Sequence, residues 1–169
     1  MLTLILRGLR LNQLKSEYIR GTSVIYHEKI LATFKPNDDE VIFSIHPQLE
    51  MHQYEVLRNV ILETMAGNDA VLDETGCQLG YLENGEAAYL IKNWEPWKAF
   101  LTKAKLRTLE GQNVILKNEG GQELGNGLLA EYKFESEPFR LISCTIITIF
   151  GERKFEGETL TIEPTNQFS

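Results

Sequence analysis

The side chains of this chain that could do chemistry are few and lie far apart in the sequence. The three histidines are His27, His46 and His52, and they form neither a His-x-x-x-His nor a His-Glu-x-x-His pattern. Zinc sites draw on closely spaced histidine and cysteine ligands, which this chain lacks. We therefore predict no metal site and no cofactor, and we interpret each histidine as an ordinary surface or core residue.

Covalent catalysis finds equally little support. Cys77 follows Thr75 and Gly76, and no basic residue beside it in the sequence would lower the pKa of its thiol. Cys144 lies far along the chain, and no Gly-x-Ser-x-Gly nucleophile motif occurs. We expect two reduced thiols in a cytoplasmic protein, with one long-range disulfide as the open alternative.

Two clusters of carboxylates could do acid–base work or bind a hard cation. Their members are Asp38, Asp39 and Glu40 in the first cluster, and Asp69, Asp73 and Glu74 in the second. Both clusters fall in predicted turns, where aspartate serves the backbone, and neither fits a calcium loop. The glycines of segment 120–127 precede no Lys-Ser or Lys-Thr pair and no predicted helix, so they indicate turns rather than a phosphate-binding loop.

Five aromatic residues are the candidate binding residues of this chain. They are Tyr81, Tyr89, Trp94, Trp97 and Tyr132. Exposed, such side chains could stack on bases or anchor a partner peptide. Buried, the two tryptophans would instead form the junction between the two parts of the chain, and we favour burial because no basic residues accompany them.

The charge of the chain limits its partners. The net charge is −7, and it is spread evenly, since residues 1–104 carry 10 Lys and Arg against 14 Asp and Glu while residues 105–169 carry 7 against 10. Neither part has the basic surface that binding to a phosphate backbone demands. An acidic surface suits a basic protein partner, or it serves solubility alone.

The N-terminal stretch Met1–Arg7 is apolar but too short for the core of a signal peptide. No run approaches the roughly 20 apolar residues that a membrane span requires. We therefore expect a cytoplasmic protein with no membrane association.

The first part of the chain is predicted to mix helices and strands. Residues Leu2–Leu6 alternate as in a strand, while leucine spacing further on predicts a helix over Leu9–Ile19. A strand at Ser23–Tyr26 and a hairpin over Lys29–Ile45 follow, with a turn at Pro36–Asp39.

The strongest helical pattern lies in the middle of the chain. It predicts a helix over Gln48–Ala66 that begins near Pro47 and ends at Gly67. Two short strands, Ala70–Leu72 and Gln78–Leu82, a strand or short helix at Ala87–Ile91 and a helix over Pro96–Lys105 complete the first part.

The last part of the chain is predicted to be all β. Its strands are Gln112–Lys117, Gln122–Phe134, Phe139–Phe150 and Lys154–Ile162, with turns at Asn118–Gly121 and Gly151–Arg153. Within the second strand, Leu128, Ala130, Tyr132 and Phe134 are expected on one face. Short strands with glycine turns favour a small barrel or sandwich. The predicted fold class is α+β, mostly β, with a mixed part at residues 1–104 packed on a barrel at residues 105–169.

A rhythm of glycines among apolar residues runs through the start of this last part, at Leu109, Gly111, Val114, Leu116, Gly121, Gly125, Gly127, Leu128 and Leu129. It resembles the first motif of Sm-like RNA-associated barrels, which implies a small SH3/Sm-like barrel. Two stretches depart from that family. Tyr132–Glu135 replaces its Asp-x-Asn nucleotide loop, and Phe150–Glu152 replaces a basic residue followed by glycine. These departures argue against RNA binding.

The segment Asn68–Leu82, with Ala87, Ala88 and Leu90 after it, resembles the centre of HIRAN domains. That family binds DNA ends in repair and helicase proteins. The resemblance implies a strand before the motif, where the periodicity predicts a helix, and this chain lacks the usual basic residues.

Three hypotheses for function follow. The first is a non-enzymatic binding or adaptor module whose acidic surface recognises a protein, such as an immunity or regulatory protein. The second is a nucleic-acid-associated module, supported by the two resemblances and opposed by the charge. The third is an enzyme that uses dispersed carboxylates and a histidine, with His46 or His52 in a pocket beside an acidic residue. Exposed edge strands in the last part would also allow a homodimer or ring.

Overall fold

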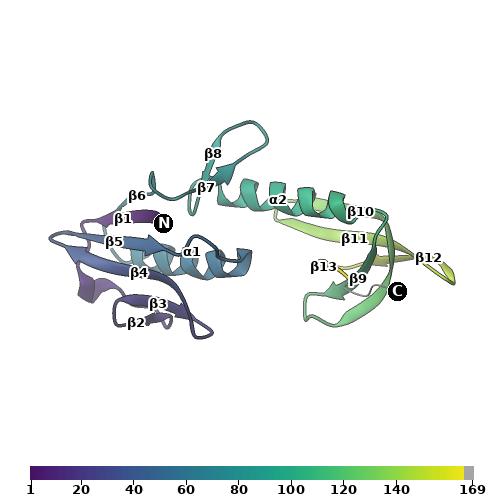
Figure 1. The fold of residues 1–169 in the computed structure, drawn as a ribbon, viewed down its shortest axis with the longest axis horizontal. Coiled ribbons are helices and arrows are strands. Elements are labelled where there is room, and N and C mark those ends of the chain that lie inside the picture. Colours follow the sequence, from purple (N-terminus) through teal and green to yellow (C-terminus); the bar gives the residue numbers. More distant parts are fainter. Residues whose placement is uncertain (166–169) are drawn as a thin grey trace. The chain divides into compact units, whose positions relative to one another are not determined.

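The computed structural model describes residues 1–165 and confirms an α+β, mostly β fold (Figure 1). Within these residues it contains two α-helices and three sheets. The chain divides into two compact units, Met1–Lys98 and Ala99–Ser169, and the division falls inside helix α2 (Trp94–Leu109). Neither helix of the described residues is long and apolar enough to cross a membrane.

The first unit is built on a six-stranded antiparallel sheet. In spatial order its strands are β2 (Ile19–Arg20), β3 (Ser23–Tyr26), β4 (Lys29–Asn37), β5 (Glu40–Ile45), β1 (Leu2–Arg7) and β6 (Val71–Asp73). The predicted N-terminal strand and the predicted hairpin over Lys29–Ile45 are confirmed. Successive side chains of a strand point to opposite faces of the sheet, so Leu4 and Leu6 of β1 share the buried face with Phe43 of β5.

The helix predicted over Leu9–Ile19 is wrong. That segment holds only a short 3₁₀ turn, η1 (Leu11–Gln13), before β2 begins. The reason is tertiary: the backbone N–H groups of Gly8 and Leu9 both donate to the carbonyl oxygen of Asp39, which pins the chain to the β4–β5 turn. Such bonds override a weak helical periodicity.

Helix α1 (Met51–Ala66) packs against β3 and β4. It begins three residues later than predicted, because Glu50 is the N-cap and its backbone N–H donates to Gln53 Oε1 at 3.1 Å. Pro47 therefore lies outside the helix. The buried face of α1 carries Leu57 and Ile61, as the helical spacing predicted.

A two-stranded sheet of β7 (Gln78–Tyr81) and β8 (Ala87–Tyr89) follows β6 and leads to α2. The loop after β8 is held by Glu74, whose carboxylate accepts backbone N–H groups from Ile91 and Lys92, each at 2.9 Å. Helix α2 begins at Trp94, two residues before the predicted start at Pro96.

The second unit is a five-stranded antiparallel sheet. In spatial order its strands are β12 (Gly151–Glu156), β11 (Phe139–Thr148), β10 (Glu123–Ser136), β9 (Asn113–Asn118) and β13 (Leu160–Pro164). Its core joins Leu106 and Leu109 of α2 to inward side chains of the strands, among them Val114 and Ile146. Cα atoms of β11 and β13 approach within 8 Å, so the sheet curls, and β12 and β13 are its two edges.

The prediction for the end of the second unit is wrong in two places. The turn lies at Ile149 and Phe150 rather than at Gly151–Arg153, because Thr148 pairs with Gly151 across the hairpin. The predicted strand Lys154–Ile162 is divided into β12 and β13.

A bulge also changes the predicted faces of β10. The register shifts between Leu129 and Glu131, which inserts one extra residue into the strand. Leu129 is therefore buried and Leu128 exposed, opposite to the prediction, while Tyr132 and Phe134 pack on the core as expected. Because side chains alternate along a strand, one inserted residue exchanges the two faces.

Candidate functional site

The two tryptophans belong to the core of the first unit. Trp94 is 1% exposed and Trp97 is 8% exposed. Their ring centroids lie 5.8 Å apart, and the ring of Tyr54 on α1 lies 6.5 Å from that of Trp94. The favoured interpretation of these tryptophans as buried residues is confirmed, and neither ring is open to a base or a peptide.

The three candidate tyrosines do not form one surface. Tyr81, at the end of β7, is 61% exposed, and Tyr89, at the end of β8, is half-buried. Tyr132 lies in the second unit, where its hydroxyl donates to Glu110 at 2.5 Å. Burial, and then this hydrogen bond, raise the pKa of Tyr132.

Packing accounts for two glycines of the HIRAN-like segment. A Cβ atom at Gly80 would lie 2.8 Å from Nε1 of Trp97, and one at Gly76 would lie 2.9 Å from the carbonyl oxygen of Thr3. Both positions therefore need glycine for close approach within the first unit. The glycines of this motif follow from the core and do not require a DNA-binding role.

Both cysteines are free, and each is buried in the core of one unit. Burial, and to a lesser degree the charge of Glu74, raise the pKa of the Cys77 thiol to about 12. Burial raises the pKa of the Cys144 thiol to about 11. Because the thiolate is the nucleophile, these two side chains are suited to packing and not to attack.

Two carboxylates of the second predicted cluster, Asp73 and Glu74, accept hydrogen bonds from the backbone, as expected. Asp73 accepts hydrogen bonds from the backbone N–H and the hydroxyl of Thr75, at 3.2 and 2.7 Å, and pairs with Arg7 at 3.0 Å. The bonds from Thr75, and then Arg7, lower the pKa of Asp73. Within residues 1–165, no three His, Cys, Asp or Glu side chains are arranged to hold a metal ion.

A histidine beside a carboxylate does occur in α1. His52 Nδ1 lies 3.4 Å from Glu50 Oε2, but the two side chains are 54% and 72% exposed. The third hypothesis requires such a pair inside a pocket, where low dielectric shifts its pKa values. This pair is exposed at the surface and therefore lacks that enclosure.

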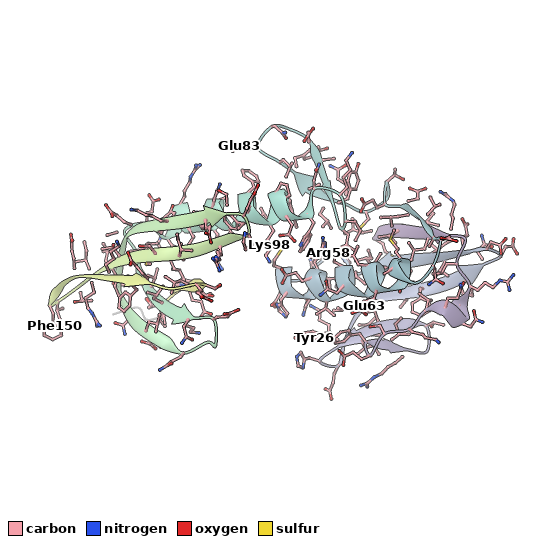
Figure 2. All side chains as sticks on the ribbon, turned by 180° about the vertical axis from the view of Figure 1, so that it is seen from behind. Tyr26, Arg58, Glu63, Glu83, Lys98 and Phe150 are labelled. Carbon is pink, nitrogen blue, oxygen red and sulfur yellow. The ribbon has the colours of Figure 1, made fainter. Side chains whose placement is uncertain are left out.

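The turn between β11 and β12 is the most prominent apolar feature of the surface. Ile149 is 93% exposed and Phe150 is 90% exposed, more than any other large apolar side chain of residues 1–165. Figure 2 shows Phe150 at the far end of its hairpin. The turn is held by Thr148, whose Oγ1 accepts the N–H of Phe150 and donates to the carbonyl of Gly151, both at 3.1 Å.

The apolar surface continues from this turn onto the sheet. Leu128 and Ile147 lie opposite each other on β10 and β11, and both are partly exposed. We name these two residues, together with Ile149 and Phe150, the apolar tip. Ile149 and Phe150 are almost fully exposed and therefore contribute little to the core. Their apolar side chains are free to contact another molecule.

A polar hollow of about 400 Å³ borders the apolar tip on the same three strands. It is lined by Ala130, Glu131, Tyr132, Lys133, Ser143, Thr145, Glu152 and Lys154. The register places Glu152 opposite Ile147, and Lys154 opposite Thr145 one row further along. An apolar centre with a charged and hydroxyl-bearing border is the usual composition of a protein interface.

The sequence analysis missed the apolar tip because it predicts that the strand extends to Phe150, whereas β11 ends at Thr148. An available signal was the apolar pair Ile149–Phe150 directly before Gly151, since glycine at a positive φ commonly ends a hairpin turn. Comparisons with protein-family models, curated proteins and solved structures give no match to this chain.

Proposed function

We propose that this chain is a non-enzymatic protein-binding module that inserts its apolar tip into an apolar pocket of a protein partner. The observation that carries the proposal is the exposure of Ile149 and Phe150 on a turn whose hydrogen bonds are already satisfied. Such turns usually hold asparagine, glycine or aspartate, which solvate well. Two large apolar residues at this place are unfavourable for an isolated chain and favourable for one that buries them in a partner.

The charge of the chain favours a protein partner over a membrane or a nucleic acid. The outer faces of β10 and β12 carry Glu131, Glu152 and Glu156 against two lysines, and the whole chain has a net charge of −7. The hollow itself is nearly balanced in charge, and it is the net charge of −7 of the whole chain that disfavours anionic lipids and phosphate backbones. A protein pocket with a basic or neutral border accepts such a surface.

The expected strength of the contact follows from its size. An aromatic side chain such as Phe150 buries about 150–250 Å² and often dominates the energy of an interface. A residue at the centre of an interface costs about 2 kcal/mol or more when truncated, which corresponds to about thirtyfold in affinity. The neighbouring polar hollow would contribute selectivity more than affinity.

The test is a nuclease-treated pulldown from the native lysate with two proteins side by side. One is the unchanged chain and the other carries Ile149→Asn and Phe150→Ser, which alter only exposed side chains. We expect a stoichiometric protein partner with the unchanged chain and its loss with the double variant. Calorimetry with the recovered partner should then show affinity weakened at least about thirtyfold.

The matched control is Glu119→Gln in the β9–β10 turn of the same sheet, which should retain the partner at full strength. Capture of the same protein by the double variant would refute the proposal. Recovery of nucleic acid that disappears after nuclease treatment would favour the nucleic-acid alternative. Co-sedimentation with vesicles of phosphatidylcholine and phosphatidylserine would favour a lipid surface, and loss of self-association in the double variant would make a second copy of the chain the occupant.

A further inference from the structure

An aromatic cluster in the first unit brings together residues that are remote in the sequence. The ring of Tyr26, at the end of β3, lies 4.1 Å from that of His27, 5.8 Å from that of Tyr18 and 5.9 Å from that of His52. The three surrounding rings are inclined to Tyr26 by 71°, 62° and 63°. His27 and His52 are exposed and both tyrosines are half-buried, so the cluster reaches solvent.

The backbone of this cluster is held in an uncommon conformation. His27 and Glu28 form the two-residue turn between β3 and β4, and their φ angles are +45° and +65°. A turn with two positive φ values strongly prefers Asn-Gly, because larger L-residues are strained there. The turn itself therefore does not account for a histidine and a glutamate, and strain of this kind gathers at functional sites.

Acidic side chains border the rings. The charge of Glu17, and least of all that of Glu63, raises the pKa of Tyr18. Glu50 lies 3.4 Å from His52.

Lys29, the residue after the turn, forms no ion pair with these carboxylates in the described residues. Lys29 directs its ammonium group to the side-chain oxygen of Gln53, a neutral partner, at 2.9 Å. Glu28 is exposed at the turn itself and adds a fourth carboxylate to those at positions 17, 50 and 63.

We propose that the aromatic cluster is a binding site for a cationic side chain, lysine or arginine, presented by a segment of a partner protein. Aromatic faces attract cations through the ring quadrupole, and a border of carboxylates increases the local concentration of positive charge. This chemistry suits a basic protein segment and disfavours nucleic acid. The site shares no residue with the apolar tip, so either surface can fail its test without the other.

The test is a titration of the ¹⁵N-labelled chain followed by amide chemical shifts. The probe is the peptide acetyl-Gly-Lys-Gly-Arg-Gly-amide, and the control peptide has glutamate in place of both basic residues. We expect saturable shifts at residues 17–28 and 50–53 and at Glu63 with the basic peptide alone. They should weaken at high salt, because exposed charges are screened.

Two variants address the mechanism. Tyr26→Leu removes the central ring and should weaken binding roughly two- to fivefold, the range of an exposed cation–π contact. Glu63→Gln removes an exposed charge with no change to the core and should also weaken binding, which covers the case in which Tyr26→Leu disturbs the fold. Tyr81→Leu, an exposed tyrosine elsewhere in the first unit, should bind as the unchanged chain does.

The proposal is overturned if the basic peptide causes no saturable shifts, if the shifts spread over the acidic surface as a whole, or if Glu63→Gln and Tyr26→Leu bind with unchanged affinity. The tip variant with Ile149→Asn and Phe150→Ser should bind the peptide normally. A loss of peptide binding in that variant would show that the two surfaces are not independent.

Discussion

Two hairpin turns of this chain, one in each unit, reverse the chain direction with different residues at positive φ. The β3–β4 turn places His27 and Glu28 in the left-handed region, with φ of +45° and +65°. The β11–β12 turn leaves Ile149 and Phe150 outside that region and assigns the positive φ, +103°, to Gly151. The first turn thus accepts backbone strain, and the second avoids it.

The two turns also differ in whether contacts within the chain hold their side chains in place. At β3–β4 the ring of His27 is held 4.1 Å from that of Tyr26, so the side chain is fixed beside other rings. At β11–β12 the side chains project into solvent with no such contact to fix them. In both turns the central residues are poor choices for a turn, and both turns belong to the surfaces for which we propose a binding role.

The largest effect is expected at Gly151, on which the relaxed turn depends. A Cβ atom there meets nothing within 4 Å, so Gly151→Ala tests the backbone conformation alone. We expect the second unit to lose about 1–2 kcal/mol of stability. Alkylation of Cys144, followed by mass spectrometry, should accelerate roughly five- to thirtyfold, because the buried thiol reacts only after opening.

Gly120→Ala is the matched control for that prediction, since Gly120 lies in the β9–β10 turn without a positive φ. It should leave Cys144 labelling unchanged or slightly slower. Equal effects of Gly151→Ala and Gly120→Ala would show that the positive φ of Gly151 is not the source of the destabilisation.

A smaller effect of opposite sign is expected in the strained turn. The double variant His27→Asn and Glu28→Gly installs residues that tolerate positive φ, and it should raise the free energy of unfolding of the first unit by about 1 kcal/mol. Labelling of Cys77 should slow about fivefold. The same variant should bind the basic peptide more weakly, because it removes a ring and a carboxylate from the aromatic cluster.

A gain in stability together with unchanged peptide binding would separate the strain of this turn from its proposed use. A loss of stability would mean that His27 contributes more through its contact with Tyr26 than the backbone strain costs.

The smallest effect concerns acid, and it is confined to the unit that holds the strained turn. The pKa of Asp73 is held below its ordinary value of 3.8, first by the hydrogen bonds from Thr75. A carboxyl with a lowered pKa stabilises the fold above its unfolded pKa, and this stabilisation is lost as the pH falls through the folded pKa. The difference in urea midpoint between pH 7 and pH 3 should therefore shrink in Asp73→Asn.

Thr75→Val removes the hydroxyl that donates to Asp73 and should reduce the acid sensitivity in the same direction. The Gly151→Ala variant should keep the acid sensitivity of the unchanged chain. An undiminished difference between pH 7 and pH 3 in Asp73→Asn would assign the acid response to other carboxylates.

The elements that were predicted correctly are those with strong local signals. The β-branched runs at Ser23–Tyr26 and Val41–Ile45 and the long helical periodicity before Gly67 all form the expected structures. Errors occur where a distant contact decides the conformation. Leu9–Ile19 is irregular because Asp39 holds its beginning, and β10 changes face at a bulge.

The candidate sites follow the same division. The sequence analysis named aromatic residues, but burial of Trp94 and Trp97 withdraws two of them from the surface. It interpreted each histidine as an ordinary residue, whereas the fold brings His52 of α1 to Tyr26, the residue before His27. Contacts between residues of different strands and helices depend on register and packing, which local sequence patterns do not predict.

The sequence by itself determined the fold class, the acidic balance, the reduced state expected of two isolated cysteines and the lack of familiar catalytic motifs, because composition and local periodicity carry that information. Only the tertiary structure decided which apolar and aromatic side chains reach solvent. The exposure of Phe150 depends on where a turn ends, and the exposure of Leu128 depends on one inserted residue. A shift of a single position in a strand moves a side chain from core to surface, so the surface of this protein is a property of the folded chain.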